Sequence, residues 1–497
     1  MAANYTQSIE FNEPVNKVWL RFIVDKERNK VLFAEAGKDF VDALFSFLTL
    51  PLGTIARIVA QRSNVEAVTV GSLSSLYQSV ENLDPQFLQT HACKDMLLKP
   101  RNSMEAYCQK LKLNIDNTEP LRYFMCENLI CRRKTGLLST FSNQNCSCGN
   151  VIDKVVIPDC LIRENGFVQE NASFIICDDL HVMPNVIGTS VHLLRNLGVD
   201  SIQDIQEKTM HIRRKEVIDL LKLSMLSKTP LTDFMFRINN QFIHNLNPRS
   251  QSEVGDVSTY KSRQMIVKVL VRKSTREVLY AEVKEDFVDL LLSFLTFPLG
   301  GVLHMLEGLS SVSSIDNLYN SMIELSSERH FMSPDLKKKL IKPLCAAQFE
   351  LRNQILPIAA SCLPTFYYSS RWGSKFQEAL TSTPKFETNC NYEMNTLLSF
   401  VDPKFCMSKS SSSGEYAKGP AMFMVTDNLV VTPMSSVSAL SYLNRSNVPL
   451  FDLKEKVIKI GVKECLSILK ASLTSTSALT NGLSQFIRTN RGALANI

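Results

Sequence analysis

The chain has 497 residues, of which 45% are hydrophobic and 21% are charged, and its formal net charge at pH 7 is +6. This length allows a few domains with substantial cores, and the composition excludes a disordered or fibrous protein. So small a positive surplus, spread over the whole chain, does not by itself indicate binding to nucleic acid or to a membrane surface.

The N-terminus and the cysteines indicate a reducing compartment. The first 14 residues, MAANYTQSIEFNEP, contain neither the basic segment nor the apolar run of a secretory signal peptide. The 13 cysteines are an odd number and include a C-x-C-G sequence, which favours free or metal-binding thiols over a set of disulfides. We therefore expect a cytoplasmic or nuclear protein.

Two strands are predicted directly after this N-terminal segment. Val18–Val24 and Val31–Ala36 are rich in β-branched and aromatic residues, and the polar sequence DKERN lies between them. This pattern is typical of a β-hairpin. We expect the hairpin to lead directly into helices.

The next stretch, KDFVDALFSFLTLPLG at residues 38–53, predicts two helices joined by a corner. Its apolar residues, such as Phe40 and Leu44, recur at helical spacing. Pro51 cannot continue the first helix, but it can open the next one. Asp42 falls inside the first helix, where we expect it on the solvated face or near the helix start.

The same stretch returns at residues 285–300 as EDFVDLLLSFLTFPLG. Twelve of the 16 positions are identical, and Phe40 and Phe287 stand 247 residues apart like the other matched pairs. A second predicted hairpin precedes this copy, and Asp289 takes the position of Asp42. The pattern predicts an α+β fold in two tandem copies of one domain, each a β-hairpin plus helices followed by a second α+β segment. The expected bounds are 15–242 for the first copy, 243–264 for a linker and 265–488 for the second copy. We expect the copies to pack together with a pseudo-twofold contact.

Residues 290–306 contain no Asp, Glu, Lys or Arg, which raises the alternative of a membrane helix. Spanning a bilayer takes about 20 apolar residues, and Pro298, Gly300 and Gly301 interrupt this run in its middle. The pattern therefore favours helices buried in a protein core, and we predict no membrane span.

Four cysteines of the first copy are candidate metal ligands: Cys126, Cys131, Cys146 and Cys148. Four thiolates suit a tetrahedral zinc ion, and a glycine after the last of them helps the backbone to turn around the sulfurs. The C-x4-C and C-x-C spacings depart from the usual C-x2-C pairs, so four free thiols are the alternative. Because protein ligands would fill all four positions, the expected role of the zinc is structural.

The second copy does not repeat this cluster. Ser369 stands in place of Cys126 and Tyr392 in place of Cys148, and Cys390 alone is retained. A zinc site is therefore expected in the first copy only.

Several sequence features together resemble one known family. The string LFAEAGKDFVDALFSFLTLPLGT, the segment SLYQSVENL, the cysteine cluster and the repetition of the whole pattern are similar to the plant family catalogued as domain of unknown function 674 (DUF674). The resemblance extends over almost the whole chain. It implies a plant protein built from repeated units, with a cysteine-rich segment at Cys126, Cys131, Cys146 and Cys148, and it implies no settled biochemical role.

Two further segments carry reactive or charged residues. Cys177-Asp178-Asp179-Leu180-His181 has the residue types of a catalytic site, but we expect Asp178 to fix the turn after a buried strand by bonding its own backbone, and Asp427 to do the same in the second copy. Arg132, Arg133 and Lys134 follow Cys131 directly and could contact phosphates from a zinc-stabilised loop.

The chain contains no phosphate-binding glycine loop, no H-E-x-x-H and no G-x-S-x-G motif. We therefore name no catalytic residue and predict a non-enzymatic protein-interaction or scaffold protein with a structural zinc in the first copy and a protein partner. The alternatives are a nucleic-acid-binding protein that uses the basic loop, and an enzyme with a site between the copies.

Overall fold

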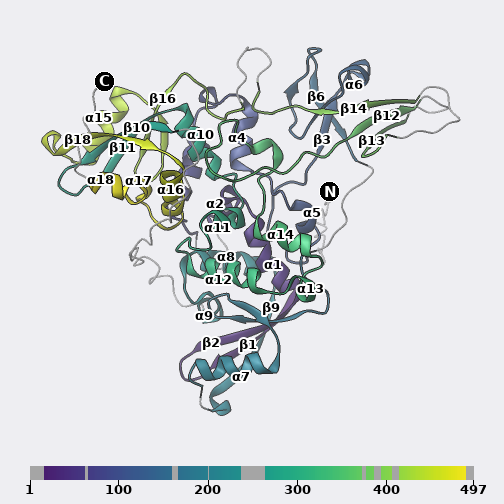
Figure 1. The fold of residues 1–497 in the computed structure, drawn as a ribbon, viewed down its shortest axis with the longest axis vertical. Helices are drawn as coiled ribbons and strands as arrows, with labels where there is room; N and C mark the ends of the chain where they lie inside the picture. The colour runs from purple at the N-terminus through teal and green to yellow at the C-terminus, as the bar shows by residue number, and fades with distance from the viewer. Residues whose placement is uncertain are drawn as a thin grey trace, which may run out of the picture.

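The computed structural model describes residues 16–61, 65, 67–158, 166–199, 201–236, 264–371, 377–384, 393–405 and 414–488. Within these ranges the protein has the predicted α+β fold (Figure 1). We call residues 16–236 the N-terminal half and residues 264–488 the C-terminal half. The predicted linker lies outside the described residues except for its last position.

Each half contains one five-stranded antiparallel sheet. The N-terminal sheet has the order β8-β7-β2-β1-β9, and the C-terminal sheet has the order β17-β16-β11-β10-β18. The strands of the first are β1 (Val18–Asp25), β2 (Lys30–Gly37), β7 (Ser173–Cys177), β8 (Val182–Pro184) and β9 (Ile205–Ile212). Those of the second are β10 (Met265–Arg272), β11 (Val278–Lys284), β16 (Met422–Thr426), β17 (Val431–Pro433) and β18 (Leu453–Ile460). Both predicted hairpins are confirmed.

The two sheets agree in detail as well as in strand order. The pairing of β1 with β2 shifts register between Ile23 and Val24, and the pairing of β10 with β11 shifts between Leu270 and Val271. The first strand of each hairpin alternates buried and more exposed residues, because one sheet face covers the core.

Helices pack against the inner face of each sheet and fill the middle of the molecule (Figure 1). The helices of the N-terminal half, including α6 and α7, which lie outside this central core, are α1 (Lys38–Thr49), α2 (Leu52–Val59), α3 (Leu73–Asn82), α4 (His91–Leu98), α5 (Glu105–Cys108), α6 (Leu129–Thr135), α7 (Ile187–Asn196), α8 (Arg214–Leu226) and α9 (Pro230–Phe236), with 3-10 turns at Pro85–Phe87 and Ile202–Asp204. Those of the C-terminal half are α10 (Glu285–Phe294), α11 (Leu299–Met305), α12 (Ser313–Glu324), α13 (Ser327–His330), α14 (Pro334–Ile341), α15 (Ser436–Arg445), α16 (Val462–Thr474), α17 (Ala478–Gly482) and α18 (Ser484–Arg488), with 3-10 turns at Ala347–Phe349 and Leu450–Asp452.

The predicted corner is present, since α1 ends at Thr49 and α2 begins after Pro51. Its apolar residues lie in the protein core, as expected. Among the described helices, none combines the length and the apolar character that a bilayer crossing requires.

The two Pro-Leu-Gly corners form the central contact between the halves. The backbone N–H of Leu52 donates to Phe297 O at 2.9 Å, and the N–H of Leu299 donates to Leu50 O at 2.9 Å, so the two contacts are reciprocal. A Cβ atom at Gly53 would lie 3.0 Å from Leu295 O, and a Cβ atom at Gly300 would lie 3.0 Å from Leu48 O. The strongest sequence repeat is therefore also the place where any side chain in place of glycine would crowd the backbone of the other half.

A second pair of reciprocal contacts joins loops to the opposite half. In the loop before β7, Gln169 N donates to His330 O at 2.9 Å, and Phe167 O accepts from Met332 N at 3.0 Å. In the loop before β16, Tyr416 O accepts from Gln89 N and Lys418 N donates to Phe87 O, each at 2.8 Å. One continuous apolar core runs through both halves.

Asp42 and Asp289 are buried, with only 1% and 3% of their surfaces exposed, so the expectation of solvated positions was wrong. Each carboxylate caps one of these loops. Oδ1 of Asp42 accepts from Phe167 N at 2.8 Å and from Val168 N at 3.0 Å. Burial raises the pKa of Asp42, whereas the Lys38 ammonium and the two N–H groups act in the opposite direction.

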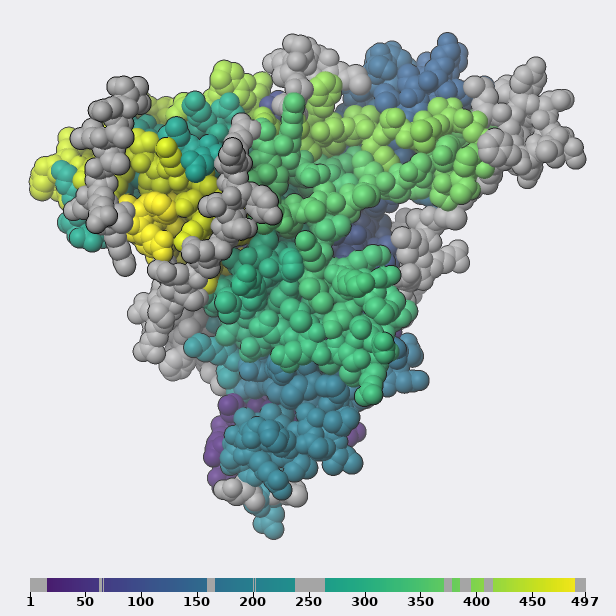
Figure 2. All heavy atoms as spheres, viewed as in Figure 1, coloured from purple at the N-terminus to yellow at the C-terminus, as the bar shows by residue number. Residues whose placement is uncertain are grey.

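Two small sheets form a third lobe beside the two sheet-bearing ends. One has the order β15-β4-β3-β6-β5 and the other β13-β12-β14. Their strands are β3 (Tyr123–Cys126), β4 (Leu137–Ser139), β5 (Gln144–Asn145), β6 (Val151–Val156), β12 (Tyr367–Arg371), β13 (Gln377–Thr381), β14 (Glu393–Leu397) and β15 (Ser399–Phe400). Because β15 of the C-terminal half pairs with β4, this lobe is built by both halves, as the adjoining blue and green atoms at the upper right of Figure 2 show.

Candidate metal centre

The first two cysteines are placed by a strand end and a short helix. Cys126 ends β3, and α6 begins three residues later, at Leu129. The Asn128 side chain caps α6, since its Oδ1 accepts from Ile130 N at 2.9 Å and from Cys131 N at 3.1 Å. Gly136 ends the helix in the left-handed conformation, with φ 56°. Helix α6 therefore holds Cys131 in a fixed position beside the strand.

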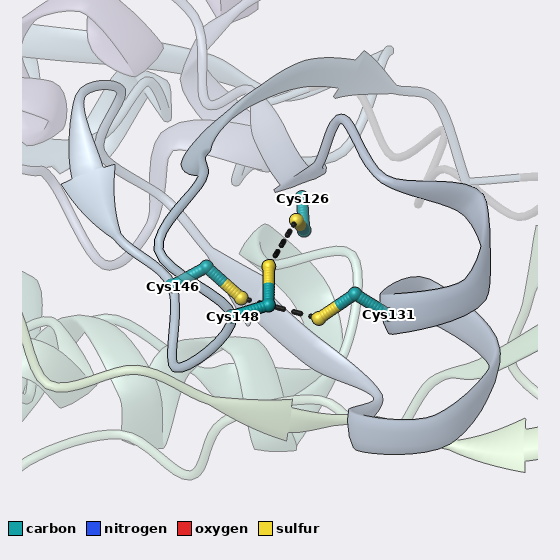
Figure 3. Close-up of side chains that lie close together, drawn as sticks. All are labelled: Cys126, Cys131, Cys146 and Cys148. Carbon is teal, nitrogen blue, oxygen red and sulfur yellow. Dashed lines mark hydrogen bonds between the residues drawn. The ribbon is translucent and has the colours of Figure 1, made fainter.

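The other two cysteines lie in the tight turn between β5 and β6. Cys146 N donates to Asn150 O at 2.9 Å, and Gly149 N donates to Cys146 O at 3.0 Å. Gly149 has φ 87°, a conformation that L side chains rarely adopt, so the glycine of the C-x-C-G sequence is required by the turn. The turn directs both sulfurs toward β3 and α6 (Figure 3).

The four sulfurs are mutually close, as the sequence predicted. All lie within 4.8 Å of one another; the Sγ atoms of Cys131 and Cys146 are 3.3 Å apart, and those of Cys126 and Cys148 are 3.5 Å apart (Figure 3). Tetrahedral zinc, with Zn–S bonds of roughly 2.3 Å, separates its sulfur ligands by about 3.8 Å. The arrangement therefore has the dimensions of a site for a single four-coordinate ion.

The surroundings of the cluster are largely apolar. Cys126, Cys131 and Cys146 are buried, Cys148 is exposed, and fully buried Ile152 packs against the cluster. Burial raises the pKa of Cys126 to about 12 and also raises that of Cys131. The backbone N–H of Asn150, followed by the neighbouring thiols, lowers the pKa of Cys148 to about 7. A bound cation would hold the thiols in their ionised form and displace their protons.

The basic residues beside Cys131 do not form an open loop. Arg132 lies in α6 with only 4% of its surface exposed. Its Nη1 donates to Cys126 O at 2.8 Å and to Glu127 O at 2.7 Å, and its Nη2 donates to Glu378 Oε1 at 2.7 Å. The hypothesis that Arg132 contacts phosphates was therefore wrong, because its guanidinium braces the cysteine segment against the C-terminal half.

Arg132→Gln is expected to lower the free energy of unfolding by roughly 2–4 kcal/mol, because it takes a donor from the Glu378 carboxylate and from two backbone carbonyls, of which that of Cys126 is buried. Urea denaturation of the purified protein measures this loss. Lys134→Gln is the matched control, since Lys134 is exposed on the same helix. A variant of Arg132 with unchanged stability and a weakened, salt-dependent affinity for nucleic acid would contradict the bracing role.

The Cys177–His181 segment is a structural turn. Asp178 accepts from Thr232 N and from Thr232 Oγ1, both at 2.8 Å, and Asp427 makes the same pair of bonds to Thr480. These carboxylates hold the start of α9 and α17, so the expectation that they bond their own backbone was wrong. Burial raises the pKa of Cys177 to about 12, which disfavours a nucleophilic thiolate.

Sequence reasoning missed a second polar site, a pocket of about 20 Å³ lined by Met265, Asp286, Asp289, Leu290, Leu351, Asn353, Gln354, Ile355 and Glu415. The signal was a difference between the two halves. Lys38 in the N-terminal half corresponds to Glu285, and Gly166, before the loop capped by Asp42, corresponds to Glu415. Both differences make this place more negatively charged in the C-terminal half than in the N-terminal half.

Comparison with known proteins identified one family. The family model described as "Protein of unknown function (DUF674)" matches residues 15–463. No curated protein and no solved structure matched the chain.

Proposed function

Since the chain belongs to the DUF674 family of proteins of unknown function, we propose that it is a non-enzymatic protein-interaction or scaffold protein whose third lobe is held together by a structural zinc ion. The four-cysteine cluster carries the proposal. Its ligands would be Cys126, Cys131, Cys146 and Cys148, whose sulfurs lie within 4.8 Å of one another. A zinc ion held by four thiolates has no open position for substrate, so it stabilises a fold and activates no water.

We also propose that the two halves are copies of one domain, with bounds near 15–242 and 265–488. The shared strand order and the register shift at the same place in both hairpins support this. The copies differ at the cysteines. Ser369, which stands in place of Cys126, donates its hydroxyl hydrogen bond to Asn395, while Cys390 and Tyr392 lie outside the described residues.

Exposed apolar residues on corresponding helices support an interaction role. Val191 on α7 is 44% exposed and Leu440 on α15 is 63% exposed, and both occupy the fifth position of their helix. Next to them, Ile187 and Val437 are also exposed. Figure 1 shows α7 and α15 at different outer ends of the molecule, so the chain presents two similar surfaces to protein partners.

Joint substitution of Val191 and Leu440 by glutamate is expected to abolish capture of protein partners from an extract of the native cells without lowering the melting temperature. Both side chains are exposed, so the substitutions remove apolar contact area without disturbing the core. Quantitative mass spectrometry of the captured proteins is the readout. Ile157→Glu, at a 74% exposed position outside these helices, is the control that keeps the partners. Equal capture of partners by the wild-type chain and by the double variant would refute the proposal, and so would robust turnover of metabolites by the purified chain.

A further inference from the structure

The two buried aspartates of α1 and α10 have the same backbone partners but different charged neighbours. Asp289 Oδ1 accepts from Tyr416 N at 2.9 Å and from Ala417 N at 2.7 Å, as Asp42 Oδ1 does from its own loop. In the N-terminal half, the second oxygen of Asp42 accepts from Lys38 Nζ at 2.8 Å. The same ammonium donates to Val168 O at 2.8 Å. A buried alkylammonium thus neutralises the first aspartate.

The second aspartate has no such partner within the part of the chain that the structure describes. Glu285 stands one helical turn before Asp289, where α1 has Lys38, and its carboxylate lies against Gly419. Oδ2 of Asp289 is buried and has no hydrogen-bond partner among the described residues. An unpaired buried carboxylate oxygen is costly, because it has lost its water without gaining a donor or a positive charge.

The space beside Asp289 is also different. In the N-terminal half, a Cβ atom at Gly166 would lie 2.1 Å from Asp42 Oδ2, so the ion pair fills the space next to that glycine. In the C-terminal half, Glu415 replaces the glycine, and the pocket of about 20 Å³ adjoins Asp289. That volume holds about one water-sized group, and an ammonium head is of this size.

The lining of the pocket suits the head and the first carbons of an alkylamine. Of the described residues that line it, Asp286, Asp289 and Glu415 are acidic, none is basic, and four are apolar: Met265, Leu290, Leu351 and Ile355. The Asn353 amide donates to Glu415 Oε1 at 2.5 Å and so orients that carboxylate. The buried Gln354 Nε2 has no partner among the described residues, and rotation of its amide would exchange this donor for an acceptor.

We propose that this pocket binds the primary ammonium group of a small alkylamine, which takes the place at Asp289 that Lys38 Nζ holds at Asp42. The ligand completes in trans the ion pair that the first half makes within its own helix. The amine is recognised by charge, by its three hydrogen-bond donors and by an apolar wall along its chain. This inference is independent of the zinc centre and of the interaction surfaces.

Protons compete with the amine for Asp289. The pKa of Asp289 is raised to about 8, chiefly by burial and also by the Glu415 and Asp286 carboxylates, against the N–H groups of Ala417 and Tyr416, which act in the opposite direction. The thiol of Cys93 on α4 and the hydroxyl of Tyr416 are the other titratable groups that interact with this carboxylate, and the Lys404 ammonium lies over the Tyr416 ring. Amine affinity is therefore expected to fall about tenfold for each pH unit below 8, because each binding event releases one proton.

Calorimetric titration of the full-length protein with n-butylammonium chloride at pH 8.5 tests the proposal, with potassium, magnesium and calcium chlorides as competing probes. The expected result is one saturable butylammonium site that weakens at pH 6.5. Glu285→Lys supplies the ammonium from the protein itself, so it is expected to abolish butylammonium binding and to raise the melting temperature. Asp289→Asn, which keeps the shape of the side chain, is also expected to abolish binding.

Three results would overturn the proposal. Binding that survives in the Glu285→Lys variant would place the amine elsewhere. Saturable binding of a metal cation, without binding of butylammonium, would assign the pocket to a metal. Absence of all binding between pH 6.5 and 8.5, together with an Asp289 that titrates near pH 8, would mean that the carboxyl holds only a proton. The Lys38→Ala variant gives a positive control, because it is expected to create a second butylammonium site at Asp42.

Discussion

Joint substitution of Cys131 and Cys146 by serine is expected to remove the single zinc ion that we propose for the wild-type chain and to unfold the third lobe locally. Structural zinc sites contribute apparent binding free energies of roughly 10–16 kcal/mol at neutral pH, which is more than a small segment can replace. Native mass spectrometry measures the zinc content, and hydrogen exchange of residues 123–156 measures the local unfolding. Cys362→Ser, at an exposed cysteine outside the cluster, is the control that keeps both properties.

Native mass spectrometry also distinguishes a bound zinc ion from four thiols that lie close together by chance. Acidification is expected to release the ion, because protons compete for thiolates whose pKa is raised by burial, as at Cys126 and Cys131. The remainder of the chain should keep its protection, since the central core does not include the four cysteines. A wild-type chain that is purified under reducing conditions with zinc and yet contains none would reduce the cluster to four free thiols.

Asp42→Ala is expected to lower the free energy of unfolding by roughly 3–5 kcal/mol, the usual cost of removing one partner from a buried ion pair. The substitution leaves the Lys38 ammonium, whose side chain is 10% exposed, without its counter-charge. It also removes the acceptor for the N–H groups of Phe167 and Val168. Denaturant titration at pH 7 measures the loss.

Asp39→Ala is the control for this prediction, because Asp39 is three residues away on the same helix but forms a surface ion pair with Lys112. Surface pairs contribute roughly 0–1 kcal/mol. A loss below 1 kcal/mol at Asp42, equal to that at Asp39, would show that the buried pair stabilises nothing beyond its own desolvation cost.

Sequence reasoning succeeded where the determining interactions are local. The hairpins follow from alternating β-branched residues and short polar turns, and the helix corner follows from Pro51, which cannot continue a helix. The cysteine cluster was also predictable, because Cys126 and Cys148 are only 22 residues apart and both belong to one small sheet and its turns. In each case the residues that settle the structure are near neighbours in the chain.

The mistaken predictions concern residues whose partners are distant in sequence. Asp42 was expected on a solvated face or near the helix start, because nothing near it indicates the loop at Phe167, 125 residues later, that needs its carboxylate. Arg132 was considered a phosphate contact because nothing near it in the sequence indicates Glu378, its partner in the other half, which is 246 residues away. A charged residue in an amphipathic pattern is exposed by default, and only the tertiary fold reveals an internal partner.

Under the proposed duplication, the reciprocal backbone contacts beside Pro51 and Pro298 have an evolutionary consequence. A single-copy ancestor could have made the same contacts as a symmetric homodimer, with the twofold axis between the two prolines. Gene fusion would then have made the dimer permanent. After fusion, one and the same sequence no longer had to occupy both places of the pair, so the two copies could diverge. The thiols of one copy and the acidic pocket of the other are the kind of asymmetry that a homodimer of identical chains cannot evolve.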